Sequence, residues 1–287
     1  MTQKQTWHEK LYLHAGQYFL IDKLLYKKKN QYQEIVIFKN SILGYVMAID
    51  GIIQTTEKDE FIYHEMLTHV PMFTHGNIKN VLIIGGGDGG ILREICRHKN
   101  IKHITMVEID IDIINLCKKY FPKHNCRAYQ DSRLTLVIDD GLSFIKKTKT
   151  KFDLIISDST DPINHGKNLF SSEFYSTCKI RLDKDGIFVS QNGVPFFQKK
   201  TLLLTHKKLK KFFCNTNFYQ ASIPTYYGGI MTFAYATNNA GFFKNININD
   251  LQLRIKSTKL SFNYYNAKIH IGSFFLPQYI LNMLEKS

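Results

Sequence analysis

The chain has 287 residues, of which 44% are hydrophobic and 22% charged, as is ordinary for a globular protein with a full-sized core. Its formal net charge is +14, but only 6 of the 38 basic residues are arginines, and the lysines are dispersed in short groups. Because bidentate recognition of phosphates and bases favours arginine, we expect a solvated basic surface and no specific nucleic-acid partner.

Two other classes of protein are disfavoured. No apolar run reaches the length of a membrane span and the first residues contain no hydrophobic signal segment, so we expect a cytoplasmic protein with no membrane partner. The five cysteines are scattered and form no CxxC pair. They therefore predict neither a disulfide framework nor a zinc site, and we expect no metal.

Residues 1–70 are expected to form a small N-terminal antiparallel β-domain with a linking helix. Strands are predicted at 34–38, 44–49 and 52–56, and a tight turn at Asp50-Gly51 separates the last two. Apolar residues at helical spacing predict the linking helix over 60–70, with Pro71 beyond its end.

Residues 71–287 are expected to form a second, Rossmann-like domain of the methyltransferase type. Predicted strands alternate with predicted helices, which indicates a parallel sheet with helical crossovers. The strands are expected at 81–84, 104–108, 134–138, 153–157 and 187–190, and the helices at 110–120, 141–147, 171–181 and 199–213. Two last strands, 218–223 and 230–236, are joined by only six residues and must form an antiparallel hairpin. The fold class is therefore α/β, with a mostly parallel seven-stranded sheet closed by a β-hairpin. Two more helices are expected near 249–256 and 277–286.

The glycine-rich turn over 85–90 follows the first of these parallel strands and precedes a helical segment. Glu108 ends the next strand about 20 residues later, where such folds bind a ribose. A tight turn alone would also use glycine, but strand, turn, helix and acid together favour a nucleoside-binding unit.

Acids follow four of the five parallel strands, at the edge of the sheet where ligands bind. They are Asp88, Glu108, Asp140 and the pair Asp158 and Asp161. Asp140, with Gly141, also fits a helix cap, and Asp161-Pro162 also fits a turn, whereas Asp158 ends an apolar strand where a carboxylate has no structural task. Neighbouring carboxylates repel one another and raise their own pKa values, so the cluster predicts a cationic substrate.

Aromatic side chains accompany these acids. Tyr63 and Tyr226 suit a slender alkylammonium chain, whereas Tyr227 is expected in the core. His64 and His69 are five residues apart and project from different sides of a helix, so a shared metal ion is not expected. His64 is either a satisfied helical histidine or a contact to the nucleoside.

The motifs of this chain, taken in order, resemble those of bacterial spermidine synthases, a family of polyamine aminopropyltransferases. The resemblance runs essentially from end to end and rests on six segments: residues 7–9, 50–66, 82–89, 107–110, 156–162 and 224–229. One departure lies after Asp161-Pro162-Ile163, where the family often has Gly and Pro and this chain has Asn164-His165-Gly166.

The resemblance implies a homodimer that transfers the aminopropyl group of decarboxylated S-adenosylmethionine to putrescine, giving spermidine and 5'-methylthioadenosine. The donor is a co-substrate, and no prosthetic group is implied. The residues implied in donor binding are Gln33, His64, Asp88, Glu108, Asp140 and Gly141. Those implied at the acceptor are Tyr63, His64, Asp88, Asp158, Asp161 and Tyr226. Asp158 is the implied catalytic proton acceptor.

Three other functions compete with this one. An amine N-methyltransferase that uses S-adenosylmethionine is the nearest, because it shares the fold. A nicotinamide oxidoreductase matches only the glycine spacing, and a basic RNA-binding module has only net charge in its favour.

Overall fold

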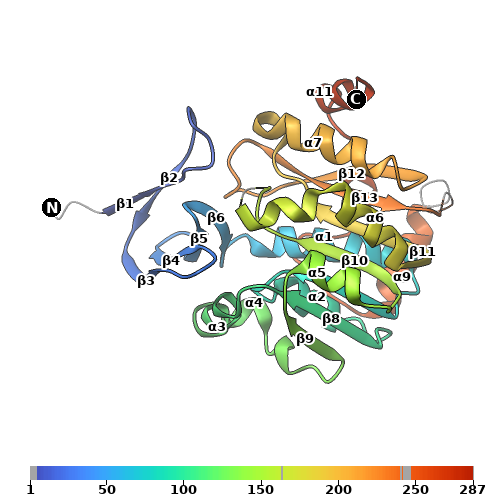
Figure 1. The fold of residues 1–287 in the computed structure, drawn as a ribbon, viewed down its shortest axis with the longest axis horizontal. Helices are drawn as coiled ribbons and strands as arrows, with labels where there is room; N and C mark the ends of the chain where they lie inside the picture. The colour runs from blue at the N-terminus through green and yellow to red at the C-terminus, as the bar shows by residue number, and fades with distance from the viewer. Residues whose placement is uncertain (1–4, 163, 240, 242–246, 287) are drawn as a thin grey trace.

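The computed structural model describes residues 5–162, 164–239, 241 and 247–286, with no side-chain detail for residues 164 and 165. A small β-domain projects from one side of a larger α/β domain (Figure 1). Within the described part of the chain, no helix has the length and apolarity needed to cross a bilayer.

The N-terminal part contains two antiparallel sheets. The strands are β1 (Gln5–His8), β2 (Tyr18–Ile21), β3 (Lys23–Lys29), β4 (Glu34–Asn40), β5 (Gly44–Ile49) and β6 (Ile52–Thr56). β1 pairs with β2, and the other four form a sheet in the order β3-β4-β5-β6. The three strands predicted here are confirmed, but the prediction missed β1 to β3. β3 was missed because it is an edge strand rich in lysine, which hides its pattern.

Both faces of the four-stranded sheet are covered. Alternate side chains of β4 point to opposite faces, so Ile35 and Ile37 pack against Cys117 and Phe121 of the large domain. Phe38 and its neighbours on the other face contact Trp7 and Phe19 of the β1–β2 hairpin. The sheet is thus held against the large domain, where it can form one wall of a site.

The large domain is built on the predicted seven-stranded sheet, in the order β12-β13-β11-β10-β7-β8-β9. The strands are β7 (Asn80–Gly85), β8 (His103–Glu108), β9 (Leu134–Ile138), β10 (Phe152–Asp158), β11 (Leu182–Gln191), β12 (Asn215–Ser222) and β13 (Ile230–Thr237). β13 pairs antiparallel with β11 and β12, which confirms the closing hairpin, and the remaining pairs are parallel.

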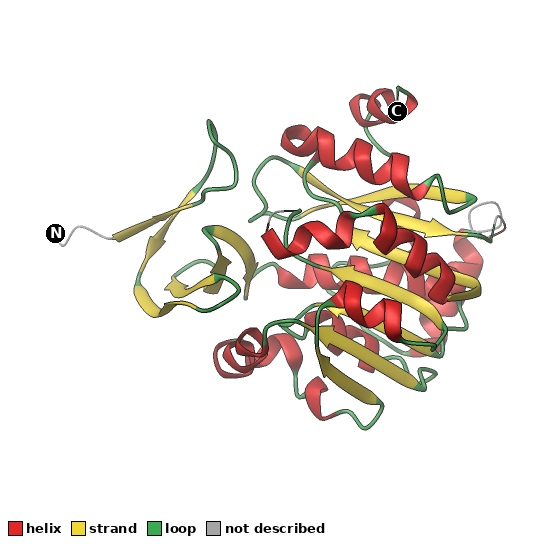
Figure 2. Cartoon of the chain, in the orientation of Figure 1, coloured by secondary structure: helices red, strands yellow, loops and turns green. Residues whose placement is uncertain are grey.

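Helices cover both faces of this sheet (Figure 2). The core on one face includes residues of α1 (Glu60–His75), α2 (Gly90–Cys96), α9 (Ile248–Thr258) and α10 (Ala267–Ser273). The core on the other face includes residues of α5 (Gly141–Lys147), α6 (Ser172–Arg181), α7 (Pro195–Leu209) and α11 (Gln278–Glu285). α3 (Ile111–Tyr120), α4 (Pro122–Asn125) and the 3-10 helices η1 (Ala128–Gln130) and η2 (Asn164–Phe170) complete the described helices. The central strands are apolar throughout because helices bury both faces.

Two helices were predicted with wrong boundaries. The helix expected to stop at Val70 continues through Pro71 to His75 and ends at Gly76, which adopts a left-handed conformation. Burial of Met72 and Phe73 explains why the helix continues, since their packing offsets the hydrogen bond that proline cannot make. The predicted boundary between residues 70 and 71 therefore falls inside α1. The helix expected at 199–213 is α7, which starts and ends four residues earlier, with Pro195 in its first turn.

Glu65 attaches the C-terminal segment to α1. Its buried carboxylate accepts backbone N–H bonds from Asn263, Tyr264 and Tyr265 at 2.7 to 2.9 Å. We predict that Glu65→Gln lowers the free energy of unfolding by about 1 to 3 kcal/mol, because an amide NH2 then faces a backbone donor. Urea unfolding measures this, and an unchanged midpoint and slope would contradict the assignment.

Candidate active site

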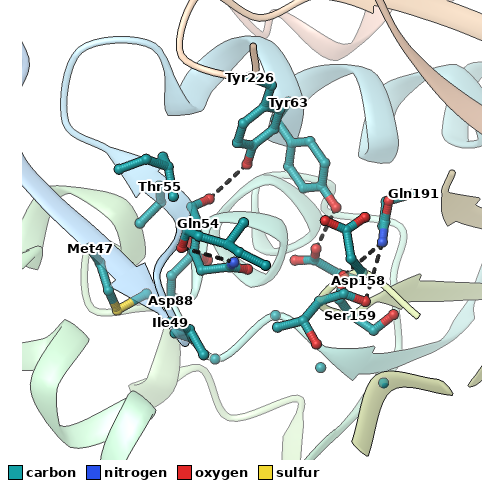
Figure 3. A pocket seen from close by; sticks show the side chains of 18 of the residues that line it. Met47, Ile49, Gln54, Thr55, Tyr63, Asp88, Asp158, Ser159, Gln191 and Tyr226 are labelled. Atoms are coloured by element: carbon teal, nitrogen blue, oxygen red, sulfur yellow. Dashed lines mark hydrogen bonds between the residues drawn. The ribbon is translucent and has the colours of Figure 1, made fainter. Parts of the chain in front are cut away.

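One large pocket opens at the carboxyl ends of the parallel strands and is closed on one side by the N-terminal β-domain (Figure 3). It encloses about 1530 Å³ of empty space, counting its open mouth. Every residue that the sequence analysis assigned to a site lies in its lining. These residues are Gln33, Tyr63, His64, Asp88, Glu108, Asp140, Gly141, Asp158, Asp161 and Tyr226.

The glycine turn after β7 brings two of the acids together. Gly85 and Gly86 have φ of 81° and 72°, and the Gly86 N–H donates to the Asp158 carbonyl oxygen at 3.0 Å. A Cβ on Gly85 would lie 1.9 Å from that oxygen. Glycine is therefore required here both for its conformation and for the close approach of β10. The approach places the end of β10, with Asp158, beside the loop that carries Asp88.

Asp158 is a base with an elevated pKa. Burial and the negative charge of Asp88 raise its pKa from 3.8 to about 6. The Tyr63 hydroxyl donates to Asp158 Oδ1 at 2.5 Å and so fixes its orientation (Figure 3). A carboxylate with this pKa is ionised at neutral pH and yet accepts a proton more readily than an ordinary aspartate.

The pKa of Asp88 is shifted in the opposite direction, so the expectation that the acids raise one another's pKa is wrong for this residue. Burial alone would raise the pKa of Asp88, but the charge and hydrogen bond of His64 lower it below the ordinary value. His64 Nε2 lies 3.1 Å from Asp88 Oδ2, and Asp88 Oδ1 accepts the Gly90 N–H at 2.9 Å. The contacts with His64 and Gly90 therefore hold Asp88 in place and favour its ionised form.

Glu108 lies where the sequence analysis expected a ribose contact. Burial raises its pKa to about 7, although the Asp110 backbone N–H donates to Glu108 Oε1 at 3.0 Å. Asp110 caps α3 by accepting the Asp112 N–H and also accepts a 2.8 Å bond from Gln33. A carboxylate at this strand end suits vicinal hydroxyl groups.

Asp140 caps α5, one of the two alternatives that the sequence left open, and it also lines the pocket. Its carboxylate accepts the Ser143 N–H at 2.8 Å. A Cβ on the adjacent Gly141 would lie 2.4 Å from Ile84 Cγ2, so the start of α5 can approach the sheet only with glycine at this position. The start of α5 is therefore closely packed against β7.

Tyrosines and a further acid line the end of the pocket near β6. The Tyr226 hydroxyl donates to the Gln54 carbonyl oxygen at 2.7 Å, and the Tyr226 ring meets the Tyr63 ring edge to face (Figure 3). Burial raises the pKa of Asp161, which accepts a 2.9 Å bond from Gln198. Tyr227 was wrongly expected in the core: it is 37% exposed and stacks on Phe197.

Several pocket residues were missed, because nothing in the sequence indicates by itself that these side chains reach the pocket. Glu9 and Tyr12 come from the N-terminal segment, and Glu60 is hydrogen-bonded to His64 from the preceding turn of α1. Gln191 and Gln198 bond to the loop after β10. The Trp7-His8-Glu9 motif was the only available signal for Glu9. Ile163 and the side chains of Asn164 and His165, where this chain departs from the related motif, lie outside the described residues.

The chemistry of the pocket suits an organic cation better than a metal ion. One atom each of His64, Asp88 and Asp158 lies within 4.8 Å of the other two, a spacing that could hold a metal. However, both ring nitrogens of His64 face carboxylates, those of Glu60 and Asp88. An imidazolium has no lone pair for a metal, and the two aspartates remain available to an ammonium group. His69 points elsewhere, to Glu94 and His98, as its spacing from His64 predicted.

Comparisons with known proteins agree with this geometry. Residues 60–248 match the family model of the spermine/spermidine synthase domain, and residues 6–57 match that of the spermidine synthase tetramerisation domain. A polyamine aminopropyltransferase of Buchnera aphidicola subsp. Acyrthosiphon pisum (strain Tuc7) is 68% identical over 287 residues, covering 100% of both chains. One from Erwinia tasmaniensis is 55% identical over 284 residues, covering 99% of each.

Two solved structures of spermidine synthases are also similar to this chain. A spermidine synthase in complex with the transition state analogue AdoDATO has a TM-score of 0.93 at 36% identity, over 100% of this chain and 98% of that one. The spermidine synthase of Thermotoga maritima has a TM-score of 0.91 at 35% identity, over 100% and 97% of the two chains. This chain belongs to the spermidine synthase family of polyamine aminopropyltransferases.

Proposed function

We propose that this protein transfers the aminopropyl group of decarboxylated S-adenosylmethionine to putrescine, releasing spermidine and 5'-methylthioadenosine. The observation that carries this proposal is a pair of adjacent aspartates with opposite pKa shifts. Asp88, held ionised by His64, suits the donor's ammonium group, and Asp158, with a pKa of about 6, suits a proton acceptor. Family membership supports the same reaction.

Donor recognition is assigned to the half of the pocket around the glycine turn. Glu108 is proposed to bind the ribose, while Gln33, Asp140 and Gly141 line the rest of the nucleoside site. A donor without a carboxylate presents a bare ammonium, so an ionised Asp88 favours it over S-adenosylmethionine, whose own carboxylate would be repelled.

Acceptor recognition is assigned to the end lined by Tyr63, Asp161 and Tyr226. Aromatic faces and buried carboxylates together stabilise an alkylammonium chain. An amine with a pKa of about 10.4 costs roughly 4 to 5 kcal/mol to present neutral near pH 7. Removing its proton to Asp158 as bonding proceeds reduces that cost.

The bonds formed and broken balance within these two substrates. The amine nitrogen attacks, in line, the propyl carbon next to the sulfonium, and a new C–N bond forms. The C–S bond breaks, its electron pair returns to sulfur, and a neutral thioether leaves. The amine proton passes to Asp158. Holding the nitrogen against that carbon supplies much of the acceleration.

Assembly and location are further proposals. We propose that the chain forms an oligomer, with a homodimer as the smallest unit. The match of residues 6–57 supports assembly through the N-terminal part, as does the exposure there of Leu13, Tyr18 and Ile42. A cytoplasmic location and the lack of a specific nucleic-acid partner stay predictions from the sequence.

A product assay tests the reaction directly. Purified protein is incubated with putrescine and either decarboxylated S-adenosylmethionine or S-adenosylmethionine, and the products are identified by mass spectrometry. We expect spermidine from the first donor and no methylated amine from the second. Transfer of a methyl group would instead establish the N-methyltransferase alternative.

Asp158→Asn tests the proton acceptor in two ways. We predict a fall in turnover of about 10² to 10⁴ with little change in donor affinity, because Asn accepts no proton. We also predict that the variant is more stable than the natural protein at pH 8, by about 1 to 3 kcal/mol. The folded pKa exceeds the unfolded one, so ionised Asp158 destabilises the fold above pH 6, and the difference disappears below about pH 4.

Turnover and thermal unfolding of both proteins between pH 4 and pH 8 provide the measurements. Near-normal turnover would remove Asp158 from its role. A variant that is less stable at pH 8 would contradict the raised pKa.

A further inference from the structure

A row of alternating charges starts at Asp88, and two of its members, Glu60 and Arg93, have no role in the reaction described above. The order is Asp88, His64, Glu60 and Arg93, of which the first three line the pocket. Glu60 and His64 are one turn apart on α1, Arg93 is on α2, and Asp88 precedes α2. The row therefore joins two helices to the loop that carries the donor site.

Each link of the row is a direct contact. Arg93 donates from both terminal nitrogens to the two oxygens of Glu60, at 2.9 Å each. Glu60 Oε2 is hydrogen-bonded to His64 Nδ1, and His64 Nε2 lies 3.1 Å from Asp88 Oδ2. Bidentate contact fixes the plane of the Glu60 carboxylate, and this in turn fixes the axis of the imidazole ring.

Arg93 is itself anchored on its other side. Its Nε donates to Glu94 at 2.8 Å, and one terminal nitrogen also donates to the His124 carbonyl oxygen at 2.8 Å. The guanidinium therefore has little freedom, and Glu60 is held by a rigid group.

Neighbouring groups also confine the orientation of the His64 imidazole ring. A Cβ on Gly90 would lie 2.2 Å from His64 Cε1 and Nδ1, so the ring rests directly on the first turn of α2. The rings of Tyr63 and His124 lie 5.4 Å and 6.1 Å from the His64 ring centre. With carboxylates at both nitrogens, both nitrogens must carry protons to be satisfied.

The electrostatics agree with this geometry. Burial alone would lower the pKa of His64, but Asp88 and Glu60 together raise it to about 10. Burial would likewise raise the pKa of Glu60, but His64 and Arg93 lower it to about 2. The four groups are thus all ionised at neutral pH.

We propose that Glu60 and Arg93 are positioning residues for the donor: through His64 they hold the Asp88 carboxylate in the orientation that receives the donor's ammonium group. This inference rests on the proposed function. An ordinary ion pair between α1 and α2 would contribute only stability. A positioning role also requires that donor affinity depends on Arg93, which is not in the lining of the pocket, as well as on Glu60.

The test compares Glu60→Gln with Glu65→Gln. Both variants neutralise a buried or nearly buried carboxylate on α1, but Glu65 contacts the C-terminal segment and not His64. For Glu60→Gln we expect the KM for the donor to rise about tenfold, the loss of one charged hydrogen bond, while kcat and the KM for putrescine change less than about threefold. For Glu65→Gln we expect all three constants to stay within about twofold.

A second readout does not depend on activity. Long-range ¹⁵N–¹H spectra report the protonation of both ring nitrogens, and His64→Gln assigns the signal. The charged or titratable groups that face this ring are Glu60, Asp88, His124 and Tyr63, with Asp158 beyond Asp88. We expect His64 to stay doubly protonated from pH 6 to pH 9 in the natural protein and to lose a proton within that range in Glu60→Gln.

Arg93→Lys is a second variant in case Glu60→Gln does not fold. It keeps the charge but not the bidentate contact, so a smaller rise in donor KM is expected. Unchanged donor KM in whichever of these variants folds, or an equal rise in Glu65→Gln, would overturn the inference. An absence of aminopropyl transfer by the natural protein would instead overturn the proposed function, and the spectra would still report whether Glu60 holds the His64 proton.

Discussion

The contact on which this site depends is the hydrogen bond between the Gly86 N–H and the carbonyl oxygen of Asp158. It joins the turn after β7 to the end of β10 and is possible only because Gly85 has no side chain at that point. This contact brings the carboxylates of Asp88 and Asp158 close together although they repel each other. The parallel sheet supplies the free energy that keeps them there.

His64 makes the two aspartates different. It hydrogen-bonds to Asp88 and lowers the pKa of that carboxyl, whereas at Asp158 the effect of burial and of the Asp88 charge outweighs that of His64 and raises the pKa. Under the proposed function, this difference assigns the binding of a cation to Asp88 and the acceptance of a proton to Asp158. Asp88 and Glu60 together keep His64 charged, so the proposed site includes Glu60 as well.

The parts of the fold that were predictable are those with local patterns. Apolar strands buried on both faces, separated by amphipathic helices, identified the large sheet, and the six-residue link identified its hairpin. The acids of the pocket were predictable because parallel strands bring their carboxyl ends to one edge, whereas Gln33 was named only through the family resemblance. β3 was not predictable, because its lysine-rich sequence lacks the pattern of a strand. The continuation of α1 past Pro71 was not predictable either, because proline usually ends a helix and only tertiary packing overrides this preference. The raised pKa of Asp158 agrees with the expectation for clustered acids, but the lowered pKa of Asp88 was beyond prediction, because it depends on the contact with His64, which sequence spacing does not reveal.

The central claim is that Asp158 has an elevated pKa in the free protein and that a bound cation lowers this pKa. Carbon-13 NMR of protein labelled at the aspartate carboxyl carbons, with Asp158→Asn to assign the signal, measures this pKa directly. The account predicts a value near 6 in the free protein. It also predicts a clearly lower value with the decarboxylated donor bound, because the ammonium and sulfonium favour the ionised form. An ordinary aspartate pKa, unchanged by the donor, would contradict it.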